Sequence, residues 1–241
     1  MILNELIKRL ETNSIDYYLT KFLTQEDVIK IKQIKNTNLL VYSFGGFSNS
    51  ERERMIIQNA SYATPTNDDF EISVIKITIP KIDKSITHRN ILGLLMPLGI
   101  KRESLGDIII KDNEYYIYVV KEMVNFLKCN ITRINQYLVN PEEVPLDSIQ
   151  IEIKTVEKEI NISSNRLDAI ISKTYNLSRD ISQSLITKGL VQVNHQEELH
   201  HEKSLKNDDL VSVRGYGRFI FKGIHRTTKK DRLVGNVEIF Q

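Results

Sequence analysis

The sequence has little of what disulfide, metal or membrane chemistry would require. Its single cysteine, Cys129, cannot form an internal disulfide or build a metal site alone, and we expect a small buried residue there. Ten glycines, five prolines and no biased run exclude collagen-like and low-complexity architectures. The longest apolar run, residues 91–100, has half of the ~20 residues that span a bilayer. Charged side chains interrupt the apolar positions of residues 1–9, unlike a signal peptide. We therefore expect a cytoplasmic protein without cofactor, metal or membrane insertion.

The chain has an ordinary globular composition with an uneven distribution of charge. Hydrophobic residues make up 41% and charged residues 27% of the sequence, which excludes global disorder. The formal net charge is +2, but residues 1–162 carry a net −2 and residues 163–241 a net +4. A basic final third is typical of a polyanion-binding segment, although an ordinary solvated surface also carries such a surplus.

Residues 1–68 are predicted to be a small N-terminal α/β domain. Apolar residues at helical spacing predict a helix over residues 2–10, and Thr24 precedes a second helix. A short strand over residues 39–42 leads to Ser48 and Glu51, whose capping-box spacing predicts a helix that ends at Gln58.

Residues 69–160 are predicted to form a middle domain with the element order β-α-β-β-α-β. This is the ferredoxin-like arrangement, which many RNA-recognition domains share, although no aromatic-rich RNP pattern is present. Tyr115, Tyr116 and Tyr118 share one predicted strand, where alternation would bury about half of them, so core packing and base stacking are both open. The predicted elements are a strand over 71–79, a helix over 87–98, strands over 107–111 and 115–120, a helix over 121–128 and, after a loop with Pro141 and Pro145, a strand over 149–156.

Residues 161–241 are predicted to form a third domain of two helices, over 166–175 and 179–188, followed by short strands. The strands are expected over 191–193, 210–213, 219–222 and 236–240. The ordered set Arg166-Leu167-Asp168, Ser178-Arg179, Lys188-Gly189 and Asp209-Leu210-Val211-Ser212-Val213 resembles the S4 RNA-binding domain, or α-L motif. One departure is Asp208, which stands where that family usually has a turn glycine. The expected fold class is therefore α+β, with an S4-type domain last.

The residue types also favour phosphate binding without the resemblance. Ser178 is a predicted N-cap, so the helix after it presents free N–H groups and a positive dipole end. Arg179 is unfavourable in that first turn unless a phosphate or carboxylate offsets it. Ile181 and Leu185 are expected on the buried face of this helix, and Arg179 and Gln183 on the exposed face.

The candidate RNA-binding residues of this domain include two arginines that flank a glycine-rich turn, where a nucleic-acid backbone can approach closely. For the arginines, solvated surface charge is the alternative, and for Arg166 a salt bridge with Asp168 or Asp180. The candidates are Arg166, Lys173, Ser178, Arg179, Gln183, Lys188, Arg214 and Arg218.

The wider chain resembles the YlmH-like proteins of Gram-positive bacteria. The residues that carry this resemblance are Gly45-Gly46-Phe47, Glu51-Arg52, Thr87-His88-Arg89-Asn90-Ile91-Leu92-Gly93, Leu98-Gly99-Ile100-Lys101-Arg102 and Gly106-Asp107-Ile108. The resemblance implies a monomeric, non-enzymatic protein that binds rRNA and tRNA on ribosomes. It further implies that the protein binds large subunits that carry stranded peptidyl-tRNA and acts in ribosome rescue and quality control. The family is also linked to cell division. His88, Arg89 and Arg102 are the candidate RNA-binding residues of the middle domain, where a helix cap and a solvated turn are the alternatives.

Two other classes of function stay open. The first is an RNA-modifying enzyme of the methyltransferase or pseudouridine synthase type, since pseudouridine synthases carry a catalytic Asp in a similar Arg-Leu-Asp tripeptide. Only 73 residues follow Asp168, too few for that catalytic domain, and no methyl-donor motif is present. The second is a protein-interaction adaptor. His195, His200 and His201 lie in a polar loop without the spacing of a zinc site.

Overall fold

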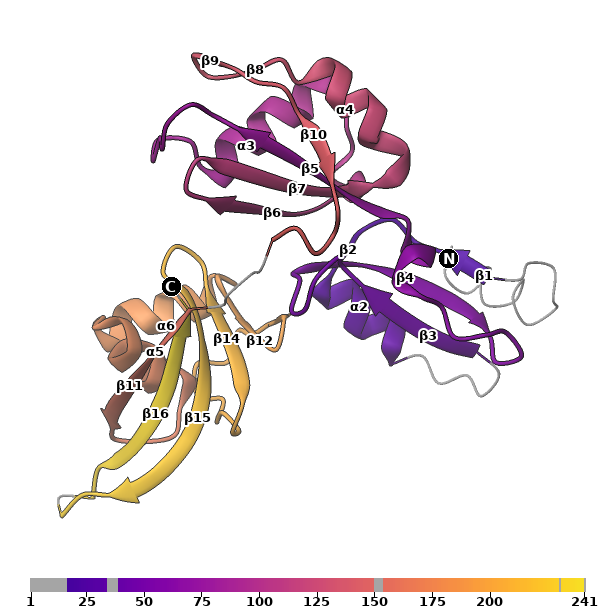
Figure 1. The fold of residues 1–241 in the computed structure, drawn as a ribbon. Coiled ribbons are helices and arrows are strands. Elements are labelled where there is room, and N and C mark those ends of the chain that lie inside the picture. The colour runs from indigo at the N-terminus through magenta and orange to yellow at the C-terminus, as the bar shows by residue number, and fades with distance from the viewer. Residues whose placement is uncertain (1–16, 34–38, 150–153, 230, 241) are drawn as a thin grey trace. The chain divides into compact units, whose positions relative to one another are not determined.

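The computed structural model describes residues 17–33, 39–149, 154–229 and 231–240. Its contacts divide the chain into two compact units, unit 1 (Met1–Gln150) and unit 2 (Ile151–Gln241), shown in Figure 1. The helix predicted over residues 2–10 lies outside the described residues. Residues 1–68 and residues 69–150 of the predicted middle domain fall within unit 1, whereas residues 151–160, predicted to end the middle domain, fall within unit 2. None of the described helices is long and apolar enough to cross a membrane.

Unit 1 begins with a four-stranded antiparallel sheet built around strand β4 (Arg52–Asn59), which pairs with each of the other three strands. Helix α2 (Gln25–Lys32) begins after Thr24, as predicted, and the Thr24 hydroxyl accepts the N–H of Asp27. The remaining strands are β1 (Tyr17–Leu19), β2 (Leu23–Thr24) and β3 (Leu39–Phe44).

The prediction of a helix that ends at Gln58 is wrong, because residues 52–59 form the strand β4. Met55, Ile56 and Ile57 are consecutive and all buried. Such a run fits a strand covered on both faces and does not fit an amphipathic helix. The buried Arg54 fixes this strand further, since its guanidinium donates to the carbonyl oxygens of Thr20, Phe70 and Glu71.

The second sheet of unit 1 has the strand order β10-β5-β7-β6 and is antiparallel throughout. With two helices, it gives the element order β-α-β-β-α-β predicted for this segment. The bounds are β5 (Ile72–Thr78), α3 (His88–Leu95), β6 (Leu105–Lys111), β7 (Glu114–Val120), α4 (Val124–Asn130) and β10 (Glu142–Val144). Shorter elements are the 3-10 turns η1 (Asn67–Phe70), η2 (Met96–Leu98), η3 (Arg102–Ser104) and η4 (Lys121–Met123), and strands β8 (Arg133–Ile134) and β9 (Tyr137–Leu138).

Two expectations for this segment are wrong. The sheet closes with β10, where a loop was predicted, and not with residues 149–156. Cys129 is exposed, because α4 turns Val124 and Leu127 to the core and Cys129 lies away from that face.

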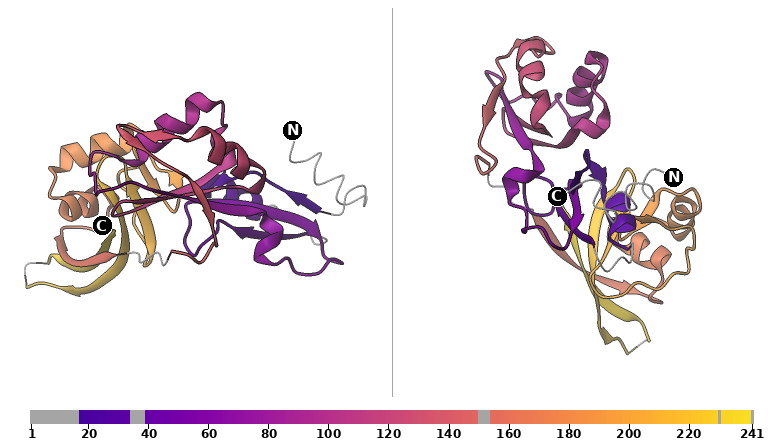
Figure 2. Two further views of the ribbon diagram at one scale, coloured as in Figure 1. Left: turned by 45° about the horizontal axis from the view of Figure 1, so that its top comes forward. Right: turned by 90° about the vertical axis from the view of Figure 1, so that its right-hand side faces the viewer.

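The second sheet of unit 1 is covered on both faces. Helices α3 and α4 pack on one face, where Ile91 and Leu127 meet Tyr115 and Ile117 in one core cluster (Figures 1 and 2). On the other face Tyr118 contacts Phe47, with ring centroids 5.0 Å apart. Tyr115, Tyr116 and Tyr118 are consequently all buried, so the expectation that alternation would bury half of them is wrong and the core-packing interpretation is confirmed.

Unit 2 is a six-stranded antiparallel sheet with two helices packed on it (Figures 1 and 2). Both helices lie within about a residue of their predicted bounds, and Phe219 and Phe221 of the sheet lie in the core beneath them. A strand was predicted over 149–156 as the last strand of the middle domain. The strand observed near there, β11, begins later and pairs with β16 in unit 2. The bounds are β11 (Thr155–Ile162), α5 (Leu167–Tyr175), α6 (Arg179–Thr187), β12 (Val191–Val193), β13 (Gln196–Glu197), β14 (Asp209–Val213), β15 (Gly217–Thr227) and β16 (Leu233–Phe240).

Candidate nucleic-acid interface

The helices of unit 2 are organised around the carboxylate of Asp168, which is fully buried at the start of α5. Gln183 Nε2 donates to Asp168 Oδ2 at 2.7 Å, and Arg179 Nε donates to the same oxygen at 3.2 Å. Arg166 Nε lies 3.3 Å from Asp168 Oδ1 as an ion pair. Three candidates from the sequence therefore converge on one buried charge.

The pKa of Asp168 shows which effect dominates at this carboxylate. Burial alone would raise it, but the hydrogen bonds from Gln183 and Arg179 and the positive charges of Arg179 and Arg166 outweigh the burial. The net pKa lies below the ordinary value, so Asp168 is an anion at neutral pH and holds two arginines in place.

The two arginines are anchored at one edge and open to solvent at the other. The Arg179 side chain is 45% exposed and the Arg166 side chain 29% exposed, while Asp168 has no exposure. Arg166 also lies 3.0 Å from Nδ1 of His201 and 3.1 Å from Glu202. The predicted salt bridge from Arg166 to Asp168 is confirmed, and the predicted offset for Arg179 in the first turn of α6 is a carboxylate.

The N-terminus of α6 is capped as predicted, but its buried face differs from the prediction. The hydroxyl of Ser178 accepts the N–H of Ile181 at 3.2 Å. Ile181 is exposed, whereas Leu185 packs against the core as predicted, and the fully buried residues of this helix are Ser182 and Ile186. The reason is that Gln183, one position further along, turns inward to the buried Asp168.

A second group of cations flanks the turn between β14 and β15. The N–H of Arg214 donates to the carbonyl of Leu190, so the turn is tied to the chain directly after α6. Arg218 lies with its guanidinium carbon 5.1 Å from the ring centroid of Phe240. Lys188 is the C-cap of α6. Arg214 and Lys188 are both exposed, and the bond to Leu190 ties the backbone of Arg214 to the segment that follows Lys188.

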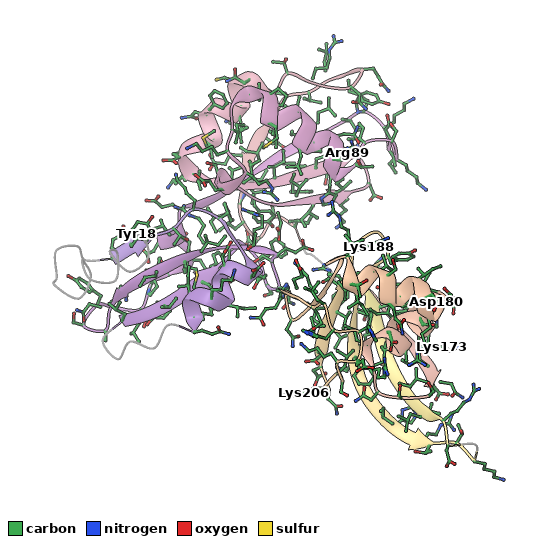
Figure 3. The ribbon with its side chains drawn as sticks, turned by 180° about the vertical axis from the view of Figure 1, so that it is seen from behind. Tyr18, Arg89, Lys173, Asp180, Lys188 and Lys206 are labelled. Atoms are coloured by element: carbon green, nitrogen blue, oxygen red, sulfur yellow. The ribbon has the colours of Figure 1, made fainter. Side chains whose placement is uncertain are left out.

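Figure 3 shows Lys173, Asp180 and Lys188 on the two helices of unit 2, with Lys206 apart from them. Lys173 is exposed on α5, and the carbonyl of Lys173 accepts a hydrogen bond from Lys158, which closes the C-terminal end of that helix. Within the described part of the chain, no group of three or more His, Cys, Asp or Glu side chains is arranged to hold a metal ion.

In unit 1 the three candidate cations take different positions. His88 and Arg89 are the exposed first residues of α3, and the residue before them, Thr87, is the cap, bonded through its hydroxyl to Asn90. Arg102 is half-buried, and its Nη1 donates to the carbonyl oxygens of Leu105 and Gly106.

Arg102 lies beside a second half-buried arginine, Arg52, contributed by the first sheet. Arg52 Nε also donates to the carbonyl of Leu105, at 3.1 Å, and burial lowers the pKa of both guanidinium groups. Next to them, burial raises the pKa of Asp107 to about 6, and Asp107 Oδ2 accepts the N–H of Glu51 at 2.6 Å. The fold therefore joins the Glu51-Arg52 and Gly106-Asp107 motifs in one polar cluster.

Comparison with known proteins identifies the family to which the chain is similar. Residues 65–148 match the family described as "Putative RNA-binding domain in YlmH". The chain is 30% identical over 227 residues to the "Ribosome-associated protein quality control protein P2" of Bacillus subtilis, covering 93% of this chain and 88% of that protein.

The chain belongs to the YlmH-like family. A solved structure, "Cell division protein ylmH from Streptococcus pneumoniae", is 31% identical, has a TM-score of 0.50, and covers 61% of this chain and 89% of that one. The resemblance predicted from the sequence motifs is confirmed for the family.

Two features of this YlmH-like chain were missed by the sequence analysis. Asp168 was weighed as a salt-bridge partner and a catalytic rival, but not as the centre of the helical site. Its spacing from Ile171 and Tyr175 on one helix face was the available signal. Arg52 was not singled out as a cation near Arg102, because only the pairing of the two sheets brings them together.

Proposed function

We propose that this YlmH-like protein binds structured RNA on the ribosome without bond chemistry, and that its target is the large subunit carrying stranded peptidyl-tRNA. The observation that carries the proposal is the 30% identity, over 93% of the chain, to a protein named for ribosome-associated quality control. The match of residues 65–148 to a family described by RNA binding supports the same function.

The proposal assigns three functional domains to the chain. Residues 1–68 form the N-terminal α/β domain and residues 69–150 the ferredoxin-like RNA-binding domain. The S4-type domain takes residues 151–241 and not the predicted 161–241, because β11 pairs with β16 in the sheet of unit 2. The S4-type assignment is supported by the two short helices packed on an antiparallel sheet and by the cations held at the helix starts. Rescue of stalled ribosomes is the role that the name of the relative favours.

The mechanism follows from the half-exposed cations. Arg179 is held on Asp168 through Nε and Nη2 and its side chain is 45% exposed, so the outer part of its guanidinium can contact phosphate oxygens. Arg166 is more enclosed, because its terminal nitrogens already lie against His201 and Glu202. Because Asp168 already fixes these side chains, RNA binding costs less side-chain entropy than it would with free arginines. Contacts of this type position an RNA and read its shape, and they need no catalytic group.

Sedimentation tests this proposal. A lysate of cells that produce the protein is run through sucrose gradients at low and high salt, and the protein is followed by immunoblot. We expect co-migration with free large subunits at low salt and loss of that co-migration at high salt, because phosphate contacts are salt-dependent. Co-migrating fractions should be enriched in peptidyl-tRNA over the bulk large subunits.

Migration at the top of the gradient in both salts contradicts the proposal. That result would favour the alternative suggested by the name of the pneumococcal structure, a role in cell division through protein contacts.

A further inference from the structure

An exposed tyrosine occupies the tip of the turn between β14 and β15. Tyr216 is 44% exposed and lies between Arg214 and Arg218, two residues away on either side. A single exposed aromatic side chain is ordinary on a protein surface, so a binding role for Tyr216 depends on how its ring is held and on what surrounds it.

The Tyr216 ring is supported from within by a ladder of aromatic rings. Its centroid lies 5.7 Å from that of Tyr175, which lies 5.9 Å from that of Phe219. Phe219 is fully buried and Tyr175 is half-buried, so the ladder runs from the core to the surface. These contacts restrict the orientation of the Tyr216 ring while leaving much of the residue exposed.

The backbone beside Tyr216 is open to close approach. Gly215 has φ +87°, and a Cβ placed there would meet no atom within 4 Å. Gly217 has φ +120°, and a Cβ there would meet only the Tyr175 hydroxyl, at 3.6 Å. The two glycines allow the sharp turn that carries Tyr216 outward and add no side chain beside its ring.

An oriented aromatic ring between two arginines fits an unpaired nucleobase with its phosphates. Every base has a π-face that stacks on an aromatic side chain, and arginines on either side can contact the adjoining phosphates. We infer that Tyr216 is a stacking platform for an unpaired base of the bound RNA. This inference rests on the proposed RNA-binding function and adds a base contact to the phosphate contacts argued above.

A tryptophan reporter gives the most direct test. The protein has no tryptophan, so Tyr216→Trp creates a single fluorophore at the stacking position. We expect octaadenylate and deproteinised ribosomal RNA each to quench this fluorescence. An equally charged ribose-phosphate oligomer without bases should leave it unchanged, because phosphate contacts alone do not stack on the indole.

Tyr18→Trp is the matched control, since Tyr18 is 40% exposed on β1 in unit 1. We expect neither RNA to quench the fluorescence of this variant. Equal quenching at both positions, or no quenching of the Tyr216→Trp variant by either RNA, overturns the inference.

Affinity measurements provide a second readout. Tyr216→Ala should weaken binding of both RNAs about tenfold, whereas Tyr216→Phe should bind like the wild type because stacking does not need the hydroxyl. An unchanged affinity in Tyr216→Ala overturns the inference. If the wild type still co-migrates with large subunits, the proposed function survives that failure, so the two failures are distinguishable.

Discussion

At the scale of single residues, Asp168 is the group on which the helical site depends. Its pKa is lower in the folded protein than the ordinary 3.8, so its stabilising effect is complete above pH 3.8 and is lost as the pH falls through the lower folded value. Asp168→Asn removes the charge that Arg166 and Arg179 share. We expect it to lower the free energy of unfolding by about 2 kcal/mol at pH 7, less than for a fully buried pair because both arginines are partly solvated. Urea unfolding measures this loss, which should shrink as the pH falls below 3.8 and through the lower pKa of Asp168 in the folded protein.

Asp180→Asn is the control for that prediction, because it removes the same charge from an exposed position in the first turn of α6. We expect a change of about 0.5 kcal/mol or less. Equal losses in the two variants would mean that Asp168 has no special role.

At the scale of elements, the sequence predicted the helices well and some strands badly, for identifiable reasons. Caps and apolar spacing marked α2, α3 and α6, since these signals are local. The residues of β4 were predicted to be a helix because buried and exposed side chains do not alternate along this strand. They do not alternate because both faces of the strand are buried, and the segments that pair with it and cover it are distant in the sequence. The three residues of β10 between two prolines gave too short a pattern to recognise.

Gly106 tests whether the two sheets of unit 1 form one packed body. A Cβ on Gly106 would lie 2.7 Å from the ring of Phe22 and 3.0 Å from Cβ of Tyr118, so Gly106→Ala must shift the buried Phe22 ring, which packs the first sheet's segment on the second sheet. We expect a loss of about 1–3 kcal/mol in the free energy of unfolding. Gly93→Ala is the control, because its Cβ meets nothing within 4 Å on the exposed side of α3, and it should stabilise the protein by up to ~1 kcal/mol. Calorimetry of both variants decides the matter, and a Gly106→Ala protein as stable as the wild type would contradict the packing.

At the scale of the whole molecule, the sequence located the basic part of the chain but not the partners of its cations. The surplus of charge in residues 163–241 and the family motifs pointed to unit 2. They could not show that Arg179 shares a buried carboxylate with Gln183, since that contact depends on how α5 crosses α6. They also could not show that Arg102 is held by main-chain carbonyls. A cation count therefore overstates the number of arginines that are free for RNA.

The salt dependence of RNA binding measures how many of these cations neutralise phosphates. If the protein contacts about five phosphates, log K should fall with log salt with a slope of roughly −3.5 to −4.5. Replacing Arg179, Arg214 and Arg218 together by Gln should make the slope less negative by about 2 to 3, because each lost phosphate contact removes about 0.7 to 0.9. Gln at position 179 keeps a donor for Asp168, so the fold of α5 and α6 should survive.

The control replaces Lys206, Lys229 and Arg232 by Gln, which removes the same net charge from other exposed positions of unit 2. Equal flattening in both triple variants would assign the effect to net charge and not to the site, whereas flattening confined to the first assigns it to the arginines of α6 and of the β14–β15 turn.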